Sequence, residues 1–164
     1  MEKENEVIVS HNFDAPIQLV FDAWTKPEHL KNWWAPATYS TTYCTVDLKI
    51  GGLFRYCMSN SEGVGIWGRG LYTEINSPFR LAYLDSFTDK DGNQVPPSYY
   101  GLQSSKIQDS KVEIDFINVN NKTTVTIKYS NMVELGEERE MARQGWSEML
   151  ALLANYLSNP IKTI

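Results

Sequence analysis

Residues 23–36 read Ala23-Trp24-Thr25-Lys26-Pro27-Glu28-His29-Leu30-Lys31-Asn32-Trp33-Trp34-Ala35-Pro36 and hold three of the five tryptophans of the 164-residue chain. A packed tryptophan buries roughly 150–250 Å² and carries one N–H that needs an acceptor. So dense a cluster is expected either to seed a core or to line a cavity. Trp24 lies one helical turn after Val20, which predicts a core position. Trp33 and Trp34 point in different directions from a short helix, so we expect at most one to be fully buried and the other to form a pocket rim.

The residues before this stretch predict a strand followed by a short helix. In Val7–Phe13 the apolar side chains alternate with polar ones, and His11 shares the apolar face, as in a half-buried strand. Asp14 is expected to cap the following helix, and Pro16 to occupy one of its first positions. A second short helix is predicted from Pro27 to Trp34.

Six further strands are predicted between residues 41 and 129, each bounded by turn-forming residues. They are Thr42–Leu48, Leu53–Met58, Val64–Ile75, Arg80–Phe87, Val112–Asn118 and Thr123–Tyr129. An antiparallel meander with one solvent-exposed face is the simplest topology. The helix predicted over Glu137–Leu157 carries an apolar stripe that is expected to cover the other, concave face. Gly145 interrupts this helix, which predicts close approach to another backbone or to a ligand.

The composition fits one domain, residues 1–164, with an ordered core over about residues 6–158, since 42% of the residues are hydrophobic and 21% are charged. The formal net charge of -5 argues against nucleic-acid and anionic-membrane partners, which bind through excess lysine and arginine. No stretch approaches the ~20 apolar residues of a membrane span, and the N-terminus has no apolar signal region. We therefore expect a cytoplasmic protein without integral membrane association.

Cys44 and Cys57 are the two cysteines, and their spacing fits neither a metal site nor a disulfide framework. We expect buried thiols on adjacent strands, no bound metal and no cofactor. Residues 63–68 satisfy the pattern GxGxxG but open a strand rather than a helix, so phosphate binding is not predicted there. Their glycines are expected to bend the sheet or to leave room for close packing. The irregular segment Thr88–Ser110 is either a flap over a cavity mouth or a surface excursion.

Two ionisable side chains fall on strand faces that could turn inward. His11 is either a hydrogen-bonded core histidine or a polar group of a ligand pocket that changes charge near neutral pH. Arg69 shares a face with Trp67, and if that face is concave its guanidinium needs an anionic partner. That partner is expected to be an acid of the chain, Asp47 or Glu74, or else an acidic ligand.

Several short sequence motifs, taken in their order along the chain, point to a family. They are Phe13-Asp14-Ala15-Pro16, residues 20–30, Trp33-Trp34-Ala35-Pro36, residues 47–55, residues 70–75, Arg80-Leu81 and Gly145-Trp146. Together they resemble the activator of heat-shock-protein-90 ATPase homologue family, within the START-like SRPBCC superfamily. The resemblance implies an α+β helix-grip fold, in which a curved antiparallel sheet wraps around a long C-terminal helix and two short helices follow the first strand.

The superfamily contains carriers of lipids and other hydrophobic ligands, polyketide cyclases and dehydratases, hormone receptors and a chaperone-binding domain. Our first hypothesis is a binding protein whose cavity, between sheet and long helix, receives a small apolar or aromatic molecule. The expected ligand-binding residues are His11, Trp24, Trp33, Trp34, Phe54, Trp67, Arg69, Tyr83, Trp146, Met149 and Leu150.

Two alternatives stay open. The first is an enzyme similar to the cyclases and dehydratases, in which His11, Arg69, Glu74 or Tyr83 would move a proton; two polar side chains that converge within hydrogen-bonding distance inside the cavity would favour it. The second is a chaperone-regulating or other partner-binding module, which exposed aromatic residues around Trp33 and Tyr99 would favour. The sequence assigns no catalytic residue, and the protein is expected to be a monomer or a homodimer.

Overall fold

The computed structural model describes residues 3, 5–36, 38–102, 104–131 and 138–159. Its elements follow in the order β1 (Glu6–Phe13), α1 (Ile17–Thr25), α2 (Pro27–Leu30), β2 (Tyr39–Val46), β3 (Leu53–Asn60), β4 (Gly65–Asn76), β5 (Arg80–Thr88), η1 (Pro97–Tyr100), β6 (Ser110–Val119), β7 (Lys122–Asn131) and α3 (Glu138–Ser158). No helix in these ranges is long and apolar enough to cross a membrane.

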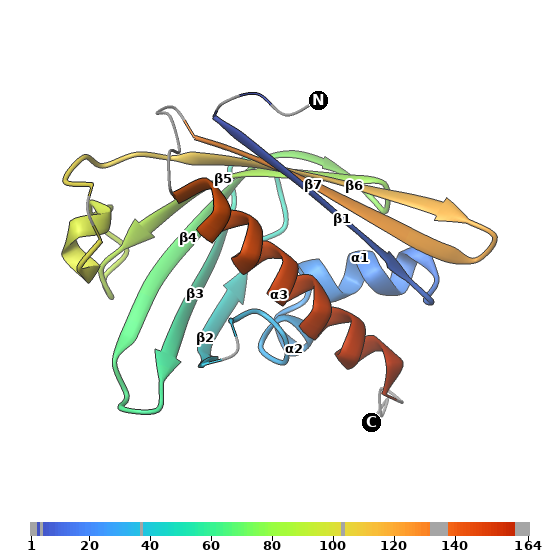
Figure 1. Ribbon diagram of the computed structural model, residues 1–164, viewed down its shortest axis with the longest axis horizontal. Coiled ribbons are helices and arrows are strands. Elements are labelled where there is room, and N and C mark those ends of the chain that lie inside the picture. Colours follow the sequence, from blue (N-terminus) through green and yellow to red (C-terminus); the bar gives the residue numbers. More distant parts are fainter. Residues whose placement is uncertain (1–2, 4, 37, 103, 132–137, 160–164) are drawn as a thin grey trace.

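The strands form one seven-stranded antiparallel sheet in the order β1-β7-β6-β5-β4-β3-β2. Strands β2 to β7 are a meander, and β1 returns to pair with β7. The sheet is strongly curled, and α3 crosses its concave side, with α1 and α2 close to the second half of the helix in this view (Figure 1). The predicted α+β helix-grip fold is confirmed, as is the predicted helix across the concave face.

Glycines in β4 decide which face of that strand turns inward. A Cβ on Gly68 would lie 2.5 Å from the ring of Tyr56, and one on Gly70 would lie 2.7 Å from the ring of Tyr83. Both rings are buried, so the glycines make room for two aromatic side chains of neighbouring strands, as expected. Since neighbours in a strand point to opposite faces, Trp67 and Arg69 lie on the convex face.

Arg69 is expected to need an anionic partner only if its face is concave, and neither of the acids named for it, Asp47 and Glu74, pairs with it. Asp47 pairs instead with Lys49, at 3.5 Å between Oδ2 and Nζ. Glu74 is bound by Arg80, whose other guanidinium nitrogens contact Glu113 at 2.9 Å and Asp115 at 3.0 Å. The described part of the chain offers Arg69 no ion pair.

A hydrogen bond from Trp33 holds the tryptophan-rich stretch and pairs a backbone carbonyl that Pro27 leaves without a helical donor. Pro27 has no N–H, so the carbonyl of Ala23 has no helical donor four residues ahead. The indole Nε1 of Trp33 donates to that carbonyl at 3.0 Å. Trp33 and Trp34 are only 2% and 3% exposed. The expectation that at most one of them is fully buried is therefore wrong, because Trp33 packs against Trp24 of α1 and Trp34 packs against Trp146 of α3.

Small details at the helix ends also differ from the expectations. Pro16 itself is the N-cap of α1, and no side chain caps the helix, so Asp14 does not cap it. His29 joins α2 to α3, since its Nδ1 lies 2.7 Å from the hydroxyl of Tyr156. A Cβ on Gly145 would meet nothing within 4 Å. The predicted close approach of another backbone to Gly145 is therefore wrong.

The two cysteines lie on adjacent strands but cannot pair. Cys44 is opposite Tyr56, and Cys57 is opposite Tyr43 on one side and Trp67 on the other. Cys44 therefore shares the concave face with Tyr56, whereas Cys57 lies on the convex face. Both thiols are free, and burial raises the pKa of Cys44 to about 11.

The described part of Thr88–Ser110 is tied to the end of the sheet. The hydroxyl of Tyr100 in η1 accepts a hydrogen bond from the backbone N–H of Trp67 and donates one to the carbonyl of Thr88. Gln94 forms an isolated bridge with Thr88. This segment is therefore hydrogen-bonded to the start of β4 and the end of β5. Its role as a flap stays a prediction.

Replacing Trp33 by Phe is expected to destabilise the protein by about 1 kcal/mol more than replacing Trp24 by Phe. Both changes remove a similar volume from one cluster, but only Trp33→Phe leaves the Ala23 carbonyl unpaired, which costs about 1–3 kcal/mol. Trp24 Nε1 is buried and has no acceptor. Chemical denaturation gives both free energies of unfolding, and an equal or larger loss for Trp24→Phe would contradict the role given to the Trp33 hydrogen bond.

Replacing Gly145 by Ala is expected to raise the free energy of unfolding by about 0.5–1 kcal/mol, since the helix gains propensity and the new methyl group meets nothing. The contrasting variant is Gly70→Ala, whose methyl group would clash with the Tyr83 ring, at a cost of about 1–3 kcal/mol. Thermal or urea denaturation of the pair checks both signs. Destabilisation by Gly145→Ala would show that the space beside α3 is closed.

Candidate functional site

Most of the predicted ligand-binding residues meet in one aromatic interior between the sheet and α3. The ring of Trp34 lies 5.1 Å from Phe54 and 5.9 Å from Trp146, and Trp24 stacks on Trp146 at 6.3 Å between centroids. The buried members are Trp24, Trp33, Trp34, Phe54, Tyr83, Trp146, Met149 and Leu150. The structure does not bring Trp67 and Arg69 to this interior, because both lie on the convex face.

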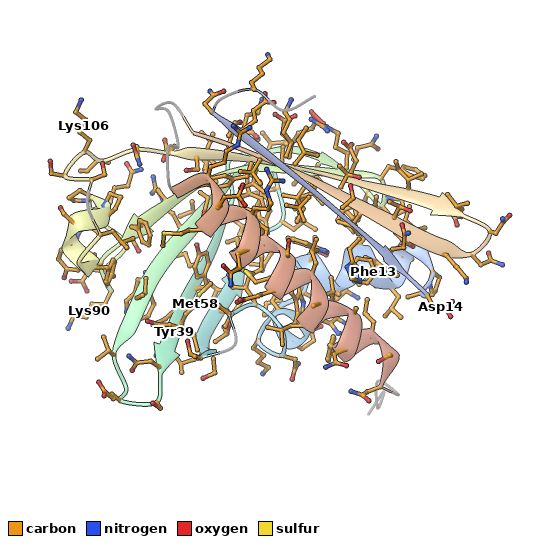
Figure 2. The ribbon with its side chains drawn as sticks, viewed as in Figure 1. Phe13, Asp14, Tyr39, Met58, Lys90 and Lys106 are labelled. Carbon is orange, nitrogen blue, oxygen red and sulfur yellow. The ribbon has the colours of Figure 1, made fainter. Side chains whose placement is uncertain are left out.

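His11 lies on the concave face but far along it from Tyr83. It is half-buried, pairs in register with Val125, and its ring is 4.7 Å from Phe13. No hydrogen bond to its side chain is present among the described residues. Figure 2 shows neighbouring Phe13 and Asp14 at the end of the molecule opposite Lys90 and Lys106.

A shallow hollow of about 140 Å³ opens beside the tryptophans. Its walls come from residues 31–36, from Tyr39, Ser40 and Thr41 at the start of β2, and from Leu152 of α3. Ligand pockets usually measure about 300–1,000 Å³, so this hollow is too small to hold a ligand alone. Trp33 and Trp34 both line this hollow, although their side chains are almost completely buried.

Polar side chains gather under the first half of α3. The hydroxyl of Tyr56 donates to Oδ1 of Asp85 at 2.8 Å. Ser110 is the register partner of Asp85, and its hydroxyl lies 2.9 Å from that of Tyr129. The Tyr129 ring is 6.2 Å from Trp146, so this group adjoins the aromatic interior.

Two tyrosines of the same region carry hydroxyls without a partner. Tyr72 and Tyr83 are paired in register on β4 and β5, and their rings lie 6.2 Å apart. Each residue is 1% exposed, and each hydroxyl is buried without a hydrogen bond. An unsatisfied buried polar group costs about 1–3 kcal/mol. Two such groups beside a carboxyl are what an interior built for packing alone would avoid.

Burial controls the electrostatics of this group. The pKa of Asp85 is raised to about 7, mainly by desolvation and also by the charge of Asp109, while the hydrogen bond from Tyr56 opposes both. Asp85 still keeps part of its surface accessible. Desolvation together with the Asp85 charge raises the pKa of Tyr56 and Tyr83, so both hydroxyls stay protonated at neutral pH. The region can therefore donate hydrogen bonds from tyrosine and exchange one proton at Asp85.

Tyr56, Tyr72 and Asp85 are the residues that sequence reasoning missed. The signal for Asp85 was present, because Leu81, Tyr83 and Asp85 alternate on one face of the predicted strand Arg80–Phe87. An acid on the inward face of a strand predicts a shifted pKa. Tyr56 follows Phe54 in the same way on the neighbouring strand.

Comparison with known proteins gives both a family and a fold. The sequence matches the family described as Activator of Hsp90 ATPase homolog 1-like protein over residues 14–158. No curated protein matches it.

Among solved structures, a protein from Arthrobacter aurescens is similar with a TM-score of 0.82 and 24% identity, covering 98% of this chain and 91% of that one. One from Staphylococcus epidermidis has a TM-score of 0.77 and 25% identity, with 96% and 92% covered. The AHSA1 protein from Silicibacter pomeroyi has a TM-score of 0.74 and 17% identity, with 93% and 97% covered. These likenesses support the START-like fold.

The free energy of unfolding is expected to fall between about pH 4 and pH 7 because of Asp85. Its pKa is raised from 3.8 to about 7 in the folded protein, so between these values the folded state binds more protons than the unfolded state and loses stability as the pH rises. Above the folded pKa this loss is complete, on the order of 2–4 kcal/mol. Urea denaturation across this range should show the slope in the natural protein and a reduced slope in Asp85→Asn. Equal slopes would contradict the raised pKa.

Proposed function

The chain belongs to the Activator of Hsp90 ATPase homolog 1-like family, and we propose that within it this protein binds a small apolar or aromatic molecule between the sheet and α3. Folds of this kind host unrelated activities, so family membership alone does not supply the proposal. The observation that carries it is the pair of buried, unpartnered hydroxyls of Tyr72 and Tyr83 near Asp85, inside an otherwise aromatic interior.

The chemistry of the interior defines the ligand class. Aromatic side chains form most of the walls, so the body of the ligand is apolar or aromatic and gains from stacking and burial. Both unpartnered hydroxyls are donors, so the ligand also carries a carbonyl, ether or similar acceptor. A ligand that accepts these hydrogen bonds recovers the cost of leaving the hydroxyls unpaired.

Entry is proposed past Gly145. This residue lies between Ala142 and Met149 on one stripe of α3, and both of those side chains pack against the core. A Cβ at Gly145 would meet nothing within 4 Å, so open space lies on this stripe, one helical turn from Ala142 and from Met149. Aromatic rings fill much of the interior, so binding requires them to move apart as the ligand enters.

The enzyme alternative rests on one specific observation. Tyr56 and Asp85 converge within hydrogen-bonding distance, and the pKa of Asp85 lies near 7, where a general acid or base works best. Of the four residues suggested by the sequence, only Tyr83 adjoins this pair, since Glu74 and Arg69 are on the convex side. Turnover that disappears in Asp85→Asn while binding persists would favour an enzyme over a carrier.

The partner-module alternative receives less support. Tyr99 is 60% exposed, as that alternative expects, but Trp33 is only 2% exposed. A chaperone partner and the choice between monomer and homodimer remain predictions.

Ligand binding is tested by screening aromatic and lipid compounds with tryptophan fluorescence and native mass spectrometry. Four of the five tryptophans lie in the interior or on its wall, so a ligand there should change their emission saturably. Tyr83→Phe should weaken binding about tenfold and yet leave the empty protein equally stable or more stable, because the lost hydroxyl had no partner. Gly145→Leu should block entry.

Gln144→Leu is the control for Gly145→Leu, since it places the same leucine side chain on the exposed side of α3. It should leave binding unchanged. Absence of saturable binding across the library, or equal binding by Tyr83→Phe and the natural protein, would overturn the proposal.

A further inference from the structure

Two arginines lie side by side on the convex face, away from the interior. Arg55 of β3 is the register partner of Arg69 of β4. Thr45 of β2 lies opposite Arg55, and Ser86 of β5 lies opposite Arg69, so these four residues form a row across the sheet. Directly opposed residues of an antiparallel pair have their Cβ atoms about 5 Å apart, and like charges in that position are destabilising. The chain, whose net charge is -5, nevertheless places two cations together here.

Nearby acids do not neutralise this pair. Asp47 is bound to Lys49 and Glu74 to Arg80. Asp89 accepts the backbone N–H groups of Asp91 and Asn93. In the described ranges, no carboxylate lies within 4.0 Å of either guanidinium, so the cost of the opposed charges stands uncompensated.

Arg55 is held in place by its neighbours. Its guanidinium carbon lies 5.9 Å from the ring centroid of Tyr43 and 5.7 Å from that of Trp67, and cation–π contacts of this kind fix a guanidinium. Nη2 donates to the carbonyl of Lys90 at 3.2 Å. Its Nε is buried without a partner, and so is the hydroxyl of Ser86. Arg55 is thus oriented before a ligand binds, and the row still contains two polar groups without a hydrogen-bond partner, Arg55 Nε and the Ser86 hydroxyl.

A hollow of about 450 Å³ adjoins the row. It is lined by Thr45, Val46, Asp47, Lys49, Gly51, Gly52, Leu53 and Arg55. Arg55 and Lys49 bring two positive charges to it and Asp47 one negative charge. The hollow gives a ligand access to Arg55 from the solvent.

We propose that Arg55 and Arg69 form a binding site for a phosphate group carried by a small molecule. Arginine is suited to phosphate because its planar fork donates paired hydrogen bonds to two oxygens. A phosphate monoester carries about -1.5 to -2 charges near pH 7, which matches two guanidinium groups, whereas a carboxylate would leave one of them unbalanced. This site is separate from the proposed ligand site under α3.

The test is titration of inorganic phosphate and of phenyl phosphate at constant ionic strength, followed by NMR of the arginine Nε–Hε signals and by thermal denaturation. Phosphate should shift the Arg55 and Arg69 signals saturably and raise the melting temperature. Arg69→Gln should weaken phosphate binding at least tenfold. Acetate and sulfate arms distinguish a carboxylate site and a general anion site from a phosphate site.

Two comparisons keep the outcome decisive. Lys26→Gln removes one positive charge from the exposed residue that follows α1 and should bind phosphate as the natural protein does. In phosphate-free buffer Arg69→Gln should be as stable as the natural protein or more stable, since the opposed charges are gone. Equal phosphate affinity in Arg69→Gln, acetate or sulfate binding as tight as phosphate binding, or phosphate titration without a shift of the Arg55 and Arg69 signals would overturn the proposal.

Discussion

The packing of four indoles joins every layer of this protein. Trp24 comes from α1, Trp33 and Trp34 follow α2, and Trp146 comes from α3. Trp24 contacts the other three, and Trp34 reaches the sheet at Phe54 and Tyr56. The cluster has a local cause, because Pro27 both ends α1 and frees the Ala23 carbonyl that the Trp33 indole then binds. That bond ties the residues after α2 back to α1.

Much of the fold could be predicted from the sequence, whereas the orientation of single strands could not. Alternation separates the two faces of β4 but does not say which is inner, and the bulk of Trp67 suggested the wrong one. The answer depends on Tyr56 and Tyr83, whose rings need the space over Gly68 and Gly70. Such a requirement exists only once β3, β4 and β5 are paired. Likewise, Trp34 packs against Trp146 of α3, more than a hundred residues away in sequence.

Both faces of the sheet bury polar groups that have no hydrogen-bond partner. On the concave face, Tyr72 and Tyr83 bury hydroxyls that meet no acceptor, and on the convex face Arg55 buries an Nε and faces another cation. Native structures pair nearly all such groups. Stability given up at a few positions is typical of sites that a ligand completes, and the Nε1 groups of Trp24 and Trp34 in the same interior also lack an acceptor.

The most direct measurement of interior binding is a crystal structure of the protein with the strongest ligand from a fluorescence screen, compared with one of the protein alone. An interior that binds ligands predicts density under α3, with an acceptor of the ligand within hydrogen-bonding distance of the Tyr83 or Tyr72 hydroxyl and with the rings of Trp34 and Trp146 moved apart. A contradictory result would be an identical, closed aromatic interior in both crystals, with the ligand bound elsewhere or not at all.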